Sequence, residues 1–122
     1  STAAGLLAGL SELQAFASAR SAESIAAVGR DWLSAHGQTP DHPLAVALVA
    51  RSAEELAEQI AAAEQSLEAD PFRPIPAPGR PDPRPAVRDR VFFSPRPVGP
   101  EGQVAFVFPG SGNQFAGMGR DL

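Results

Sequence analysis

Proline is distributed very unevenly along this chain, and its positions limit where regular structure can form. Ten of the thirteen prolines lie between residues 71 and 100. Because proline lacks the backbone N–H and clashes with the preceding turn, no helix is expected there. We expect extended chain of polyproline II or irregular type, with a brief strand pairing at Val91–Phe93. Three PxxP spacings would suit an SH3-type ligand, but a stiff connector is the favoured interpretation.

The sequence on either side of this segment has a different character, so we expect three parts. Residues 1–70 form a helical or α/β linker domain, residues 71–100 a Pro/Arg-rich extended connector, and residues 101–122 the start of a further domain. The predicted fold class is α/β: a small sheet packed by helices, then the extended connector, then the first βα unit of an α/β domain.

Three amphipathic helices are predicted in residues 1–70. The first covers about Thr2 to Ala19, and the second follows Ser21 as its N-cap and ends at Gly37. The third begins with a capping box, in which Ser52 and Glu55 would each accept the other's backbone N–H. In each helix, apolar residues recur every three or four positions and form one face. These residues are Leu6, Leu10, Leu13 and Ala17 in the first helix, Ile25, Val28 and Trp32 in the second, and Leu56, Ile60, Ala63 and Leu67 in the third.

Two apolar runs are predicted to be strands. Leu44–Val49 is an uninterrupted run of six apolar residues after two prolines, which favours a central strand covered by helices on both faces. Val104–Phe108 predicts a second buried strand, stopped by Pro109 and followed by a glycine-rich turn and the beginning of a helix.

Charge and composition exclude several classes of function. The first seventy residues contain ten acidic residues against three arginines, whereas residues 71–100 contain six arginines against two aspartates. With a net charge of −4, nucleic-acid binding is not expected. No stretch approaches the ~20 apolar residues of a membrane span, and no signal peptide is recognisable. We therefore predict a soluble, cytoplasmic protein without membrane contact.

Metal binding and histidine catalysis are also not expected. The chain has no cysteine and only two histidines, His36 and His42, neither with a set of companion ligands or a serine partner. His36 is placed at a helix end, where an imidazolium suits the helix dipole. His42 is placed in a loop, and Trp32 is assigned to the core.

The glycine-rich turn fits none of three common catalytic or binding motifs. A dinucleotide fingerprint fails because Phe115 stands where the third glycine is needed. A P-loop fails because Met118 stands where lysine is needed. A nucleophile elbow around Ser111 fails because its flanking positions, Pro109 and Asn113, are not glycine.

The turn instead resembles the opening of malonyl-type acyltransferase domains. Those domains begin with a strand, continue with the turn Phe-Pro-Gly-Gln-Gly-x-Gln, and then form a helix that carries Gly-Met-Gly-Arg. Residues Val104–Leu122 match this pattern, except that Ser111 replaces the first glutamine. The Pro-Gly-Ser-Gly-Asn variant is similar to iterative type I polyketide synthases of the enediyne and polyunsaturated-fatty-acid type. His42–Leu56 looks like the strand and helix of the linker between ketosynthase and acyltransferase.

The resemblance implies an acyl-transfer function for the parent protein. In the family, a serine in a Gly-His-Ser-x-Gly elbow attacks the malonyl thioester of malonyl-CoA, and the acyl group passes to the phosphopantetheine of an acyl carrier protein. The implied oxyanion and substrate turn comprises Ser111, Gly112 and Gln114, with the Ser111 backbone N–H as oxyanion donor. Serine at position 111 retains that donor. It puts in doubt any contact that the family's glutamine side chain makes with the substrate or with neighbouring loops.

This chain alone is not expected to be an enzyme, because no nucleophile, base or malonyl-binding arginine can be assigned in it. Arg120 is assigned a structural role, and no cofactor is expected in this segment. The implied partners are the ketosynthase and acyltransferase domains of the same polypeptide and the acyl carrier protein. The rival hypothesis is a non-catalytic interdomain spacer or interaction module; a Gly-His-Ser-x-Gly motif beyond Leu122 would distinguish the two.

Overall fold

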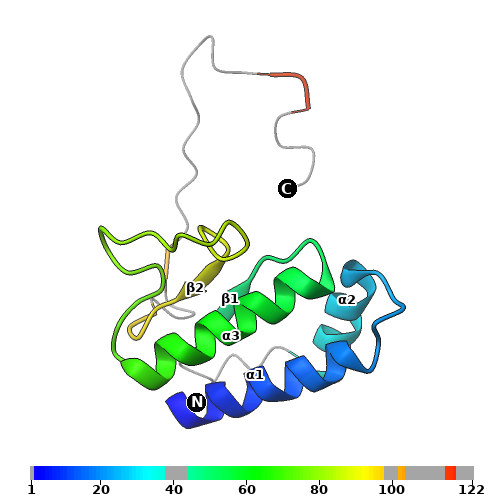
Figure 1. The fold of residues 1–122 in the computed structure, drawn as a ribbon, viewed down its shortest axis with the longest axis horizontal. Coiled ribbons are helices and arrows are strands. Elements are labelled where there is room, and N and C mark those ends of the chain that lie inside the picture. The colour runs from blue at the N-terminus through cyan, green and yellow to red at the C-terminus, as the bar shows by residue number, and fades with distance from the viewer. Residues whose placement is uncertain (1, 38–43, 98–101, 104–114, 118–122) are drawn as a thin grey trace.

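The computed structural model describes residues 2–37, 44–97, 102–103 and 115–117. The described elements are three helices and two short strands, which makes the fold mixed α/β, as predicted (Figure 1). Helix α3 lies between α1 on one side and the antiparallel pair of β1 and β2 on the other. In order along the chain they are α1 (Ala3–Ser18), α2 (Ile25–His36), β1 (Val46–Leu48), α3 (Ala53–Ala69) and β2 (Val91–Phe93).

Helix α1 forms as the sequence predicts. Thr2 is its N-cap, and the Thr2 hydroxyl accepts the backbone N–H of Gly5 at 3.2 Å. The predicted apolar face points inward: Leu10 and Ala17 are buried, and Leu6 and Leu13 pack against the same cluster. The periodicity therefore identified the buried side of this helix correctly.

Helix α2 begins later than predicted. Its N-cap is Ser24, whose hydroxyl accepts the Ala27 N–H at 3.3 Å, and not Ser21. The preceding residues form turns instead of helix, with the Glu23 N–H donating to the Arg20 carbonyl at 2.9 Å. Both serines are acceptable caps, so only these turns decide between them.

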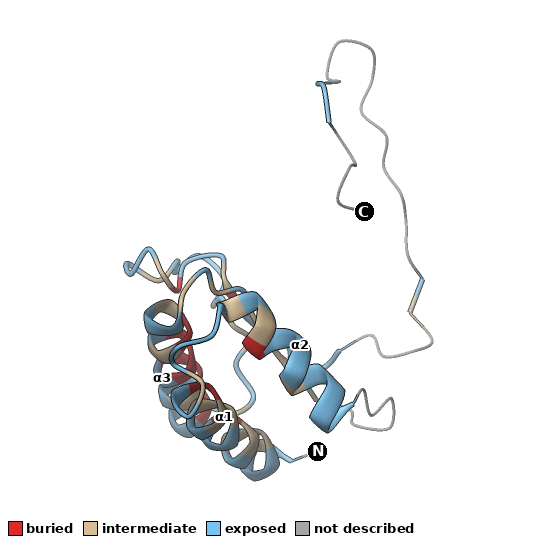
Figure 2. Ribbon diagram, turned by 90° about the vertical axis from the view of Figure 1, so that its right-hand side faces the viewer, coloured by how far each residue is buried: buried red, intermediate tan, exposed pale blue. Residues whose placement is uncertain are grey.

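The rest of α2 agrees with the prediction. The helix ends at Gly37, whose φ of 64° is a conformation that glycine adopts readily. Val28 is buried, whereas Ile25 and Trp32 are half-buried. Figure 2 shows that the buried residues concentrate along α3 and α1, while α2 is exposed over most of its surface.

Helix α3 has half of the predicted capping box. The Ser52 hydroxyl accepts the Glu55 N–H at 3.2 Å, as expected. The Glu55 carboxylate, however, accepts the backbone N–H of Arg51 at 2.9 Å and not that of Ser52. Because the Arg51 side chain also binds this carboxylate, the Glu55 side chain is held one residue further back than in the standard motif.

The strand prediction for Leu44–Val49 is correct in type but wrong in extent and surroundings. Only Val46–Leu48 is strand, and β1 has one strand partner, β2. Leu44, Val46 and Leu48 pack on the core, whereas Ala45, Ala47 and Val49 are exposed. The strand is covered on one face, not on both. The run looked doubly buried because alanine, although apolar, can face water at little cost.

The register pairs Val46 with Phe93, Ala47 with Phe92 and Leu48 with Val91.

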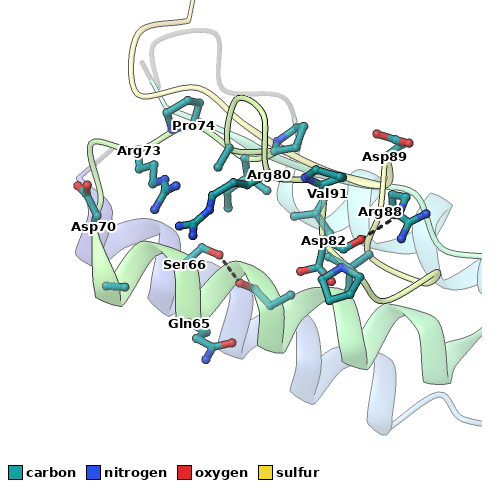
Figure 3. Close-up of a pocket in the computed structure, with 18 residues that line it drawn as sticks. Gln65, Ser66, Asp70, Arg73, Pro74, Arg80, Asp82, Arg88, Asp89 and Val91 are labelled. Atoms are coloured by element: carbon teal, nitrogen blue, oxygen red, sulfur yellow. Dashed lines mark hydrogen bonds between the residues drawn. The ribbon is translucent and has the colours of Figure 1, made fainter.

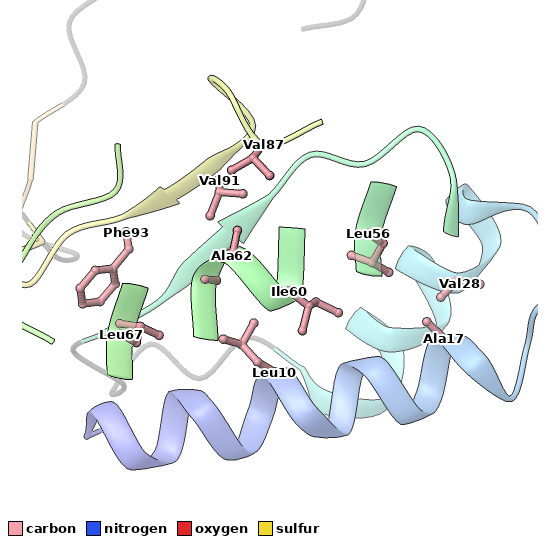
Figure 4. Packing of buried hydrophobic residues seen from close by; sticks show 11 residues of the cluster. Leu10, Ala17, Val28, Leu56, Ile60, Ala62, Leu67, Val87, Val91 and Phe93 are labelled. Atoms are coloured by element: carbon pink, nitrogen blue, oxygen red, sulfur yellow. The ribbon is translucent and has the colours of Figure 1, made fainter. Parts of the chain in front are cut away.

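The proline-rich segment is irregular, as predicted, and it returns to pack on α3. The expected pairing at Val91–Phe93 is confirmed as β2, and Ile75 extends the sheet by exchanging two backbone hydrogen bonds of 2.9 Å with Phe93. Val87, Val91 and Phe93 are buried beside the side chains of α3 (Figure 4). The division at residues 70 and 100 stays a prediction, but residues 71–97 share one core with α3.

One buried polar side chain connects the parts of this core. Gln59 of α3 is 0% exposed, and its Nε2 donates to the Val49 carbonyl at 3.0 Å and to the Ala86 carbonyl at 2.8 Å. A single amide thus links α3 to the end of β1 and to the turn before β2. Its Oε1 atom is buried without a hydrogen-bond partner in the described part of the chain.

Candidate functional site

The residues predicted as the oxyanion and substrate turn, Ser111, Gly112 and Gln114, lie outside the described residues. The same holds for the predicted strand Val104–Phe108 and for most of the helix after the turn. The assignment of this turn therefore stays a prediction.

A cleft of about 420 Å³, lined by three arginines and three aspartates, lies between the second half of α3 and the loop from Arg73 to Asp89. Arg73 and Arg80 enter it from the two arms of the proline-rich turn, and their guanidinium groups point toward one another on the side formed by Ser66 (Figure 3). Neither guanidinium hydrogen bonds or forms an ion pair with any residue in the part of the chain that the structure describes. The cleft therefore holds two converging cations.

Most acidic groups of the cleft already have partners. The Asp82 carboxylate accepts two bonds from the Arg84 guanidinium, at 2.9 and 2.7 Å, and these hydrogen bonds lower the pKa of Asp82. An Asp70 oxygen accepts the Phe72 N–H at 2.9 Å. Figure 3 shows the third carboxylate, Asp89, directed away from the two arginines.

The second hollow is an apolar groove of about 1290 Å³ between α1, α2 and β1. A Cβ atom placed on Gly9 or Gly29, which line the groove, would have no atom within 4 Å apart from its chain neighbours and the adjacent backbone of its own helix. Leu33, at the edge of the groove, is 55% exposed. The larger apolar residues that line it are Leu6, Leu10, Leu13, Ile25, Val28, Trp32, Leu44, Val46, Leu48 and Leu56.

A stacked cluster joins α1 to α2 at one end of this groove. The Arg20 guanidinium lies 3.6 Å from the centre of the Phe16 ring, Phe16 meets Trp32 edge-on, and Trp32 stacks on His36 with 3.5 Å between ring centres. His36 Nδ1 faces the Trp32 carbonyl at 3.0 Å, and Nε2 faces Glu12 Oε1 at 3.2 Å. Since both partners are acceptors, the two bonds form together only when the ring is an imidazolium.

The structure therefore places His36 at the helix end, as predicted, and adds a bond to Glu12 that the sequence did not indicate. Trp32, assigned to the core, stacks in this cluster and is only half-buried. His42 lies outside the described residues.

No group of three or more His, Cys, Asp or Glu residues that could hold a metal ion occurs in residues 2–37, 44–97 and the short described stretches after them. Of the helices in those same residues, none has the length and apolar character needed to cross a bilayer.

Sequence reasoning did not identify the convergence of Arg73 and Arg80. Four arginines in the sequence directly precede a proline, and nothing in the sequence shows that Arg73 and Arg80 are the two that face the same cleft.

Comparison with known proteins provides no assignment: the chain matches no protein-family model, no curated protein and no solved structure.

Proposed function

We propose that this chain is the linker between the ketosynthase and acyltransferase domains of an iterative polyketide synthase, together with the first residues of the acyltransferase. The observation that carries the proposal is the resemblance of Val104–Leu122 to the opening of malonyl-type acyltransferases. The mixed α/β fold of the preceding residues is compatible with a linker in which a small sheet is packed by helices.

In the proposed parent enzyme, a serine outside this chain attacks the carbonyl carbon of malonyl-CoA while a histidine accepts the hydroxyl proton. The tetrahedral intermediate then collapses, the CoA thiolate leaves, and it takes the proton from the histidine. Attack by the phosphopantetheine thiol of the carrier protein on the acyl-serine completes the transfer. The role proposed for this chain is to donate the Ser111 backbone N–H to the oxyanion in both steps.

The proposed role of Ser111 predicts opposite results for two substitutions in the complete parent enzyme. Ser111→Ala retains the backbone N–H and should leave the rate of malonyl transfer nearly unchanged. Ser111→Pro removes the donor, and loss of one such donor costs about 10²–10³ in rate. Transfer is measured with radiolabelled malonyl-CoA and carrier protein, and circular dichroism checks that each variant folds.

Loss of transfer in a folded Ser111→Ala enzyme would contradict the proposal, because the hydroxyl would then have a chemical role. A parent sequence without a Gly-His-Ser-x-Gly motif after Leu122 would contradict the acyltransferase assignment itself.

The second candidate function is a non-catalytic interdomain spacer or interaction module. The observation that favours it is the apolar groove between α1, α2 and β1, a surface that a neighbouring domain could cover. The two candidates share the linker and differ only in the domain that comes after it in the parent protein, so the same downstream motif decides between them.

A further inference from the structure

We propose that the cleft beside α3 binds a phosphate-class oxyanion between Arg73 and Arg80. The proposal does not depend on the polyketide assignment, since it rests only on residues between α3 and β2 that the structure describes.

Two guanidinium groups converge in this cleft (Figure 3). Two cations that point toward one another repel, and an anion placed between them converts this repulsion into attraction. Each guanidinium presents N–H donors in a planar fork that matches two oxygens of a phosphate. Arg73 and Arg80 have no acceptor of their own within the described residues, so their donors are available for such a ligand.

None of the three aspartates of the cleft is paired with these two arginines in the described part of the chain: Asp82 is held by Arg84, Asp89 points away from the pair (Figure 3), and Asp70 forms no ion pair with either. Arg84 holds both oxygens of Asp82, at 2.9 and 2.7 Å. The third cation of the cleft, Arg88, uses its Nε to donate to the Asp82 backbone carbonyl at 2.9 Å and still has terminal N–H groups available.

The backbone at both arginines is restricted before any ligand arrives. Pro74 follows Arg73 and Pro81 follows Arg80, and a residue before proline is restricted to extended backbone. Between them the chain reverses at Gly79, with φ of 69°, and the Arg80 N–H donates to the Ala77 carbonyl at 3.1 Å. The backbone therefore loses little conformational freedom on binding, whereas the exposed side chains of Arg73 and Arg80 have to be ordered by the ligand.

The dimensions of the cleft suit a small molecule. Its volume of about 420 Å³ lies within the usual range for ligand pockets. Ile75, Val87 and four prolines supply an apolar wall beside the arginines. The cleft could thus receive either free phosphate or the phosphate group of a small ester whose organic part lies on this wall.

A purely structural role for the arginines is the alternative. Cations stabilise the carboxyl end of a helix through its dipole, and α3 ends beside this cleft at Ala69. However, neither Arg73 nor Arg80 donates a hydrogen bond to a carbonyl of α3 in the described structure.

The test is a titration of the 122-residue chain followed by NMR of the arginine Nε–Hε signals. Inorganic phosphate and phenyl phosphate are the two ligands, with sodium chloride at matched ionic strength as the blank. The variants are Arg73→Gln and Arg80→Gln. Arg96→Gln is the matched control, because Arg96 also precedes a proline and is exposed but does not line the cleft.

We expect saturable shifts of the Arg73 and Arg80 signals, weakened on the order of tenfold by either cleft variant and unchanged by Arg96→Gln. Tighter binding of phenyl phosphate would identify an ester as the ligand, and equal affinity would identify free phosphate; both results support the site. The proposal is overturned if neither ligand shifts these signals beyond the chloride blank, or if Arg96→Gln weakens binding as much as the cleft variants. It is also overturned if the cleft variants only lower the melting temperature and the wild type shows no saturation, since the arginines would then serve the helix end alone.

Discussion

Replacing Gln59 by leucine tests how the proline-rich segment is held to the helices. The substitution keeps the side chain's approximate size but removes the donor that serves the Val49 and Ala86 carbonyls. The Ala86 carbonyl then loses its only hydrogen bond from a described residue, at a cost of about 1–3 kcal/mol. The Val49 carbonyl retains a long bond of 3.4 Å from Arg90, so we assign it at most ~1 kcal/mol.

One effect works in the opposite direction. Gln59 Oε1 is buried without a partner among the described residues, and its removal relieves about 1 kcal/mol. The net loss in the free energy of unfolding is then about 0–3 kcal/mol, with ~1.5 kcal/mol in the middle of the range. With an m-value of about 2 kcal/mol per molar urea, a loss of ~1.5 kcal/mol lowers the urea midpoint by about 0.8 M.

Urea unfolding followed by circular dichroism provides the assay, and Gln65→Leu is the control. Gln65 is on the same helix but exposed, so its replacement should change stability by less than about 0.5 kcal/mol. Gln59→Glu should cost more than Gln59→Leu at neutral pH, because it places a buried carboxylate against two carbonyl oxygens. Equal midpoints for Gln59→Leu and Gln65→Leu would refute the view that this amide holds the segment in place.

Two further predictions concern the pH dependence and the strand. Hydrogen bonds from the Arg51 side chain, followed by that from its backbone N–H, lower the pKa of Glu55 from 4.5 to about 2. The carboxylate therefore stabilises the fold above about pH 4.5 and loses this effect as the pH falls toward 2. Melting curves should show Glu55→Gln below the wild type at pH 7 and equal to it near pH 2; a constant difference across that range would contradict the assignment. For β1, Leu48→Asp should lower the melting temperature strongly by placing a charge against the core. Ala47→Asp, on the exposed face of the same strand, should have little effect; equal losses would mean that the inward face of β1 is not assigned correctly.

The local signals in the sequence predicted the helices well. Ser52 as a cap, Gly37 as a helix end and the apolar face of α1 all follow from interactions between residues a few positions apart. Such interactions depend on the immediate neighbours alone, and these are visible in the sequence.

The remaining features depend on contacts between distant residues, and the sequence does not show which segments meet. The choice of Ser24 over Ser21 depends on the path of the turn from α1 to α2. Whether one face of β1 is exposed depends on how many strands pair with it and how many helices pack against it. The pairing of Gln59 with Ala86 and the facing arginines of the cleft require the proline-rich segment to fold back. A composition rich in proline predicts stiffness but not direction.

The return of residues 71–97 to α3 determines where this protein can be cut and rejoined. A junction at residue 70 looks natural from the sequence, because the last helix has just ended. It would, however, remove Val87, Val91 and Phe93 from their contacts and expose Ile60 and Leu67, each only 2% exposed in the intact fold. A chimaera that joins another sequence to these elements should therefore keep the native chain through residue 97 and place the new joint beyond it.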